Sequence, residues 1–154
     1  MNALADYLSR FDYAAVAFTK GPTGHLELAA GVNDRPARLF LDTGAGRTVF
    51  DATRAVQFGL PRMAEAQCAG GLGATGMTAC ETTVAHFVLG PIDERDFAAT
   101  LVDLSHVNQA LEARGDRPVD GVVGADILEA REAVIDYKHS RLFLKRGVIG
   151  RRAA

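Results

Sequence analysis

The sequence from Leu39 to Asp51, LFLDTGAGRTVFD, decides the fold. In it an apolar run carries one aspartate, Asp42, into a glycine-rich turn, and a second apolar run follows. Gly44 and Gly46 have no Cβ, so the backbone there can adopt positive φ angles and approach other groups closely. The pattern leaves two interpretations of Asp42: a carboxylate that accepts hydrogen bonds from backbone amides in an Asx turn, or a carboxylate presented for chemistry.

Length and composition are those of one globular domain. The chain has 154 residues, of which 48% are hydrophobic and 23% charged, enough to bury a core. The net charge of −2 gives no electrostatic reason to expect nucleic acid or an anionic membrane as a partner. No apolar run is long enough to span a bilayer, and the N-terminus lacks the basic region of a signal peptide. With Met1 as the natural start, we expect a cytoplasmic protein.

Other motifs that carry chemistry are weak. Gly71, Gly73 and Gly76 match the GxGxxG pattern of dinucleotide sites, but that pattern must open a helix, and here it runs into a strand-like sequence. No serine lies in the G-x-S-x-G turn of serine hydrolases. The four histidines and two cysteines have no metal-ligand spacing. We expect no metal and no cofactor.

The two cysteines, Cys68 and Cys80, lie six residues to either side of Ala74. If the chain turns at Ala74, the cysteines become cross-strand neighbours with Cα atoms roughly 4.5 Å apart, within disulfide reach. The other interpretation is two unrelated small residues that are both buried. In a reducing cytosol both would remain thiols.

Strand signals dominate the chain, with two or three short helices. Periodicity and capping residues predict helices at 3–11, 51–58 and 105–114. Apolar, alternating or β-branched runs between turn residues predict strands at 13–19, 25–32, 37–41, 97–102, 119–123, 133–137 and 141–144, and a long hairpin followed by a strand at 64–89. We expect an N-terminal arm or short helix at 1–12, one domain at 13–146 and a C-terminal tail at 147–154.

Three sequence elements follow one another along the chain: LDTGA at 41–45, a glycine-rich hairpin at 70–76, and VVG at 122–124 followed by ADIL. This order resembles the retropepsin-like aspartic proteases, which are single-domain relatives of retroviral proteases and pepsin. The resemblance covers residues 13–145. It implies a mostly β fold, a closed barrel or sandwich with a flap hairpin at 69–77 that folds over a bound peptide.

The resemblance also implies roles for individual residues. Asp42 matches the catalytic aspartate, Thr43 the threonine that braces two active-site loops across a dimer, and Gly44 the glycine whose backbone lies beside the carboxylate. Substrate would be bound by the turn, the flap and the strand that supports the turn, which comprise Ala45, Gly46, Gly70, Gly71, Leu72, Gly73, Ala74, Val122, Val123 and Gly124.

Such a protease needs two carboxylates that share one proton, because two like charges held close together cannot both ionise easily. The chain has a single DTG sequence. Asp120, Asp126 and Asp136 lack the Thr-Gly setting, and we interpret them as cap or surface residues. We therefore expect a homodimer in which Asp42 of each copy supplies one acid and the substrate is a peptide or protein. The alternative is a catalytically weak module that binds peptide or dimerises.

The residues after DTG differ from those of the relatives. Pepsin-type sites have a hydroxyl residue where this chain has Ala45, and alanine cannot donate a hydrogen bond to the carboxylate. We expect an activity optimum nearer to neutral pH than that of pepsin. Retroviral enzymes commonly follow DTGA with an aspartate that binds substrate backbone and pairs with an arginine, whereas this chain has Gly46 and Arg47. The interpretations open for Arg47 are a surface residue, a substrate contact and an interface residue, and we favour the first.

Overall fold

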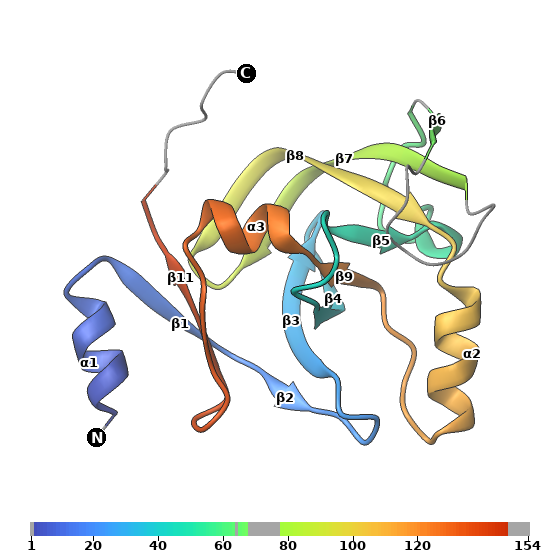
Figure 1. The fold of residues 1–154 in the computed structure, drawn as a ribbon. Coiled ribbons are helices and arrows are strands. Elements are labelled where there is room, and N and C mark those ends of the chain that lie inside the picture. The colour runs from blue at the N-terminus through green and yellow to red at the C-terminus, as the bar shows by residue number, and fades with distance from the viewer. Residues whose placement is uncertain (1, 64, 68–77, 148–154) are drawn as a thin grey trace.

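The computed structural model describes residues 2–63, 65–67 and 78–147 (Figure 1). Six strands close a barrel in the order β3 (Leu26–Val32), β4 (Arg35–Leu41), β9 (Gly121–Val123), β5 (Val49–Asp51), β8 (Ile92–Val102) and β7 (Thr78–Leu89). The pairing of β3 with β7 closes the ring. The short strands β2 (Thr19–Lys20) and β6 (Glu65–Gln67) extend the sheet. The expected mostly β, closed-barrel fold is confirmed.

The predicted flap lies outside the described residues. This holds for the five flap residues that we expect to bind substrate, Gly70, Gly71, Leu72, Gly73 and Ala74, and also for Cys68. The buried Cys80 is described, and its neighbours across the sheet are Glu65 on β6 and Leu101 on β8. The hypothesis that Cys80 lies opposite Cys68 is therefore wrong, because the register of β6 and β7 sets Cys80 opposite Glu65, three positions before Cys68.

Strand β9 lies between β4 and β5, and this arrangement positions the DTG turn. β9 runs parallel to β4, with Leu41 beside Val123, and antiparallel to β5, with Val49 beside Val122. The chain that leaves β4 must therefore cross the end of β9 before it returns as β5. Leu39 and Val123 have no exposed surface, so the strands under this crossing are anchored in the core.

A second sheet has the order β1 (Tyr13–Ala17), β11 (Arg141–Lys145) and β10 (Val134–Asp136). β10 and β11 form the closing hairpin that the sequence predicts, and β1 pairs along the whole of β11. Leu142 and Leu144 on the central strand are fully buried. They belong to the same hydrophobic cluster as the barrel residues Leu28 and Val84, so one core joins the two sheets.

Two of the three predicted helices form, at 3–11 and 105–114, whereas the helix predicted at 51–58 is reduced to a 3-10 turn at its start. α1 (Ala3–Ser9) is capped by Asn2, and the 3-10 turn η1 (Ala52–Arg54) is capped by Asp51. α2 (Ser105–Ala113) is followed by Gly115 at φ +76°. α3 (Ala125–Ala130) follows β9 directly. Figure 1 shows α1 and α2 at opposite ends of the molecule.

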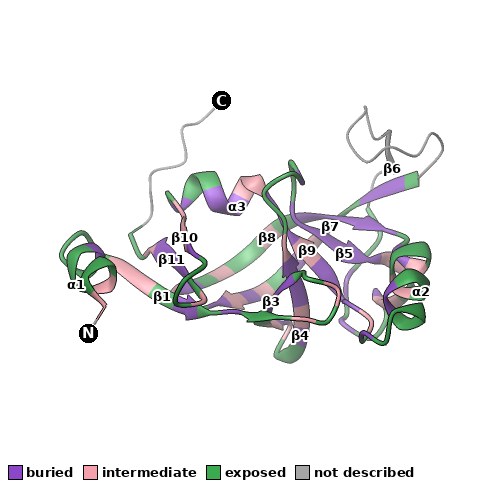
Figure 2. Ribbon diagram, turned by 60° about the horizontal axis from the view of Figure 1, so that its bottom comes forward, coloured by how far each residue is buried: buried purple, intermediate pink, exposed green. Residues whose placement is uncertain are grey.

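Burial is concentrated in the strands, whereas α1 and α2 present mostly exposed residues (Figure 2). On α1 only Leu8 is buried, while Leu4 is 37% exposed and Phe11, just beyond its end, is 51% exposed. The predicted apolar face of this helix therefore covers little of the core. No helix in the described part of the chain is long and apolar enough to cross a membrane.

Candidate active site

Asp42 directly follows β4, and its backbone is fixed by two hydrogen bonds. Its amide donates to the carbonyl of Val123 at 3.1 Å, and its own carbonyl accepts from the amide of Ala45 at 3.3 Å. The first bond ties the turn to β9, and the second closes the turn on itself. The side chain of Asp42 is exposed.

One oxygen of the Asp42 carboxylate is held by the turn. The amide of Gly44 donates to Oδ1 at 2.8 Å. A Cβ added at Gly44 would lie 3.2 Å from the same oxygen, so glycine allows this close approach. Asp42 therefore forms the Asx turn that the first interpretation expects. The second interpretation, a carboxylate presented for chemistry, is not excluded by this turn, because within the described residues Oδ2 of Asp42 accepts no hydrogen bond.

Gly124 packs directly against the DTG turn. A Cβ added at position 124 would lie 2.5 Å from the carbonyl oxygen of Arg47 and 2.8 Å from that of Ala45. Real side chains do not approach backbone this closely, so only glycine fits. The amide of Ala125 also donates to the carbonyl of Ala45 at 2.7 Å. The turn and the end of β9 therefore form one packed unit.

Thr48 and Asp126 fix the far end of the turn. Thr48 is fully buried, and Oδ1 of Asp126 accepts from its amide at 2.9 Å and from its hydroxyl at 2.8 Å. The hydroxyl oxygen in turn accepts from the amide of Gly124 at 3.2 Å. Sequence reasoning missed this role: it expected Asp126 to cap a helix or lie at the surface, but it sits in the first turn of α3 and bonds across to the loop.

The other aspartates considered as a second acid are already engaged. Asp120 is 7% exposed; its carboxylate accepts from the amide of Arg38 at 2.8 Å and from the guanidinium of Arg54 at 2.6 Å. Asp136 is 8% exposed, and a hydrogen bond from His139 lowers the pKa of its carboxyl group. Both were expected at the surface or in caps. They are buried because each ties strands or turns together.

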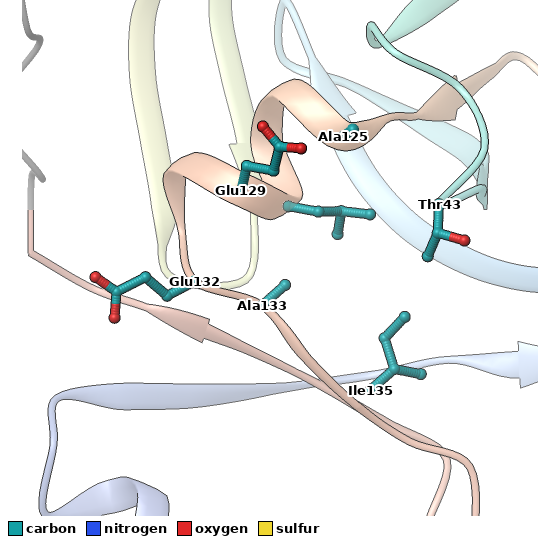
Figure 3. A pocket seen from close by; sticks show the side chains of 7 residues that line it. Thr43, Ala125, Glu129, Glu132, Ala133 and Ile135 are labelled. Carbon is teal, nitrogen blue, oxygen red and sulfur yellow. The ribbon is translucent and has the colours of Figure 1, made fainter.

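A hollow of about 380 Å³ opens beside Thr43 (Figure 3). Thr43 is exposed and borders it from the DTG turn, and the remaining lining comes from α3, from the segment that follows α3 and from β10. Its floor is apolar and its rim carries two carboxylates. The lining residues are Thr43, Ala125, Leu128, Glu129, Glu132, Ala133 and Ile135.

The expected site residues that are described lie together. The turn from Asp42 to Gly46 meets the strand end from Val122 to Gly124 through the bonds given above. Arg47 is exposed, in agreement with its interpretation as a surface residue. Within the described ranges, no group of three His, Cys, Asp or Glu side chains is arranged to hold a metal ion.

A family model described as aspartyl protease matches residues 28–127. The chain belongs to the aspartyl protease family. The matched region runs from β3 to the first turn of α3 and contains both Asp42 and Gly124. It ends before β10 and β11.

Solved structures of aspartyl protease relatives confirm the retropepsin-like fold. A retropepsin-like aspartic protease from Rickettsia conorii superposes with a TM-score of 0.56 at 20% identity, covering 86% of this chain and 89% of that one. The retroviral protease-like domain of Ddi1 from Leishmania major gives a TM-score of 0.52 at 17% identity, covering 80% and 96%. The comparison with curated proteins returns no match.

Proposed function

We propose that this family member is an aspartic endopeptidase whose catalytic dyad consists of Asp42 from two copies of the chain. The observation that carries the proposal is the state of Asp42: the residue is exposed, one carboxylate oxygen accepts from Gly44, and within the described residues the other accepts no hydrogen bond. The carboxylates of Asp120, Asp126 and Asp136 are each bonded within the chain, so they are poor candidates for the second acid.

The chemistry follows from holding two carboxylates close together. One stays protonated and one is charged, because the two negative charges repel. The charged aspartate takes a proton from a water molecule, which attacks the carbonyl carbon of the peptide bond. The protonated aspartate stabilises the oxyanion and then protonates the leaving amine, which breaks the C–N bond.

The residues around Asp42 support these steps. The amide of Gly44 fixes the carboxylate, and Gly124 allows β9 to pack against the turn. Thr43 is exposed beside Asp42, and its hydroxyl forms no hydrogen bond within the described residues, so it can bond to the second copy. We assign substrate binding to Ala45 and Gly46 in the turn, to Val122, Val123 and Gly124 beside it, and to the flap.

A catalytically weak module that binds peptide or dimerises remains the second candidate. The exposed Thr43 and the hollow beside it favour an interface whether or not the chain turns over substrate. Fold alone does not establish catalysis, so activity must be measured.

The proposal is tested by cleavage of an unfolded protein substrate. Wild type should cleave it, and Asp42→Asn should reduce cleavage to the background level. Asp6→Asn, a change of the same kind at an exposed position on α1, should cleave as wild type does. Equal cleavage by wild type and Asp42→Asn contradicts the proposal, and absence of cleavage by wild type favours the second candidate.

A further inference from the structure

Helix α1 presents an apolar face to solvent. Leu4, Tyr7 and Phe11, the last just beyond the helix, are all exposed, and Tyr7 is exposed to 58%. These positions are three and four residues apart, so the side chains lie on one face, and the rings of Tyr7 and Phe11 are 5.0 Å apart. Of the α1 residues only Leu8 is buried. Large apolar side chains gathered on one exposed face mark an interaction site.

The described chain ends beside this face. Figure 1 and Figure 2 show α1 and the end of β11 on the same side of the molecule, because β1, which follows α1, pairs along the whole of β11. The amide of Arg146 donates to the carbonyl of Asp12 at 2.9 Å. A Cβ added at Gly147 would lie 3.5 Å from the carboxylate of Asp12. Gly147 is therefore next to the turn in which Phe11 ends the apolar face.

The buried guanidinium of Arg131 fixes the position of this chain end. It donates to the carbonyls of Lys145, Arg146 and Gly147 at 3.3, 3.1 and 3.4 Å. Arg131 is the C-cap of α3 and is 8% exposed, so these bonds are shielded from water. The seven residues that follow Gly147 in the sequence therefore start from a fixed place beside α1.

We propose that these residues, 148–154, fold back on their own chain and cover the apolar face of α1. This C-terminal segment reads VIGRRAA, so its first two side chains, Val148 and Ile149, are apolar. At about 3.3 Å per extended residue they come level with Phe11 and then, one helical turn further, with Tyr7. The whole segment can span about 23 Å, whereas the seven residues of α1 span about 10 Å.

The charges of the two partners are complementary as well. α1 and the turn after it carry two acids, Asp6 and Asp12, and one base, Arg10. The C-terminal segment carries two bases, Arg151 and Arg152, and no acid. Attraction between exposed charges is weak, so it orients the C-terminal segment, while burial of its apolar side chains against α1 holds it there.

A disulfide trap tests the contact. Tyr7→Cys and Ile149→Cys are introduced together into a chain whose own thiols are removed by Cys68→Ser and Cys80→Ala. Mild oxidation should close a disulfide within the chain, seen as the loss of both free thiols at the mass of a monomer. The matched control pairs Ile149→Cys with Ser9→Cys, because Ser9 is exposed on the opposite face of α1 at a similar distance from the chain end. The control should keep its thiols under the same oxidation.

Hydrogen exchange of the α1 amides gives a second measurement, in the chain with its own cysteines. Val148→Asp combined with Ile149→Asp should speed this exchange about tenfold or more, the effect of losing one buried aliphatic side chain. The control, Ala153→Asp combined with Ala154→Asp, adds the same charge but leaves both aliphatic side chains in place. The control should exchange its α1 amides as wild type does.

Every other result overturns the inference. A disulfide between two copies of the Tyr7→Cys, Ile149→Cys chain would place the C-terminal segment on the α1 of a partner. Crosslinking of a chain with Tyr7→Cys alone would assign the apolar face to a second copy. Equal oxidation of the paired variants with Tyr7→Cys and Ser9→Cys contradicts the inference too, as does α1 exchange that ignores Val148→Asp with Ile149→Asp. None of these readouts depends on cleavage, so the inference is tested separately from the proposed function.

Discussion

Oδ1 of Asp126 lies 2.8 Å from the hydroxyl oxygen of Thr48 and 2.9 Å from its amide nitrogen. The two residues are 78 positions apart in the chain, yet one carboxylate oxygen satisfies both donors of a fully buried residue. The bonds connect the end of the DTG turn to the first turn of α3. β4 holds the start of the loop that carries Asp42, and these bonds hold its end.

Removal of the Asp126 carboxylate should destabilise the fold and slow catalysis. Asp126→Ala leaves the amide and hydroxyl of Thr48 without their acceptor, and a buried polar group left unsatisfied costs about 1–3 kcal/mol. We expect a loss of that size in the free energy of unfolding, measured by urea titration, and a lower kcat/KM. The control Asp6→Ala removes an exposed carboxylate and should change neither quantity. An unfolding free energy equal to that of wild type would show that the bonds do not hold the turn.

A methyl group at Gly124 should disturb the same turn. In Gly124→Ala the new Cβ would meet the carbonyl oxygens of Arg47 and Ala45, so backbone must move. Overpacking of this kind costs about 1–3 kcal/mol. Gly46→Ala is the matched control, since a Cβ there meets nothing within 4 Å. Thermal unfolding of both variants should give a clearly lower midpoint for Gly124→Ala alone, and equal midpoints would contradict the packing described.

His86 on β7 bonds to the turn before β4 and to the start of β8, and it should make stability depend on pH. Its Nδ1 lies 2.8 Å from Asp34 and its Nε2 lies 2.8 Å from Asp93. The hydrogen bond to Asp34, followed by that to Asp93, raises the pKa of His86 above its ordinary value of 6.5, against desolvation and the charge of Arg95. The protonated imidazole is the form that binds both carboxylates.

The raised pKa of His86 determines in which direction stability changes with pH. The contribution of His86 to the free energy of unfolding is fully present below pH 6.5, where the imidazole is protonated in both states and the two carboxylates are still charged. It is lost as the pH rises through the higher pKa of the folded state. The stability difference between wild type and His86→Gln should therefore be larger at pH 6 than at pH 8. The control is His106→Gln, at an exposed histidine, and its stability difference from wild type should not follow this pH dependence. If the stability difference between wild type and His86→Gln is the same at both pH values, the bonds of His86 to Asp34 and Asp93 do not stabilise the fold.

Ala45 should influence the pH at which the enzyme works. It is 8% exposed and offers no hydroxyl to the nearby carboxylate. Ala45→Ser would add a donor that favours the charged form of an aspartate, so the optimum of the pH–rate profile should move toward acid. The wild-type optimum should lie nearer neutral than that of pepsin. A wild-type profile that peaks only in strong acid contradicts this prediction.

Much of the fold could be predicted from the sequence because its determinants are local. The turn residues, the short helices and the closing hairpin follow from neighbouring residue types, and the DTG turn meets Gly124 as the order of the motifs implies. The strand at 92–96 was missed because IDERD is polar, yet these residues continue β8 against β7. Pairing with a long neighbouring strand overrode their weak strand preference.

The site could be predicted only in part, because its supports are distant in sequence. Asp126, Asp120 and Asp136 look alike in a single sequence, and their separate partners appear only when the chain is folded. The same is true of His86, which is 52 positions from Asp34. The motif located the carboxylate of Asp42, whereas the residues that fix the turn around it required the structure.

The most direct measurement of the central claim mixes wild type with Asp42→Asn. The two chains are unfolded and refolded together at constant total concentration, and cleavage of an unfolded protein substrate is measured against the wild-type fraction. If each site needs Asp42 from both copies, random pairing leaves about a quarter of the wild-type activity in an equal mixture. If each chain carries a complete site, half of the activity remains and the dependence is linear. A quadratic fall is the predicted result, and a linear one would contradict the two-copy active site.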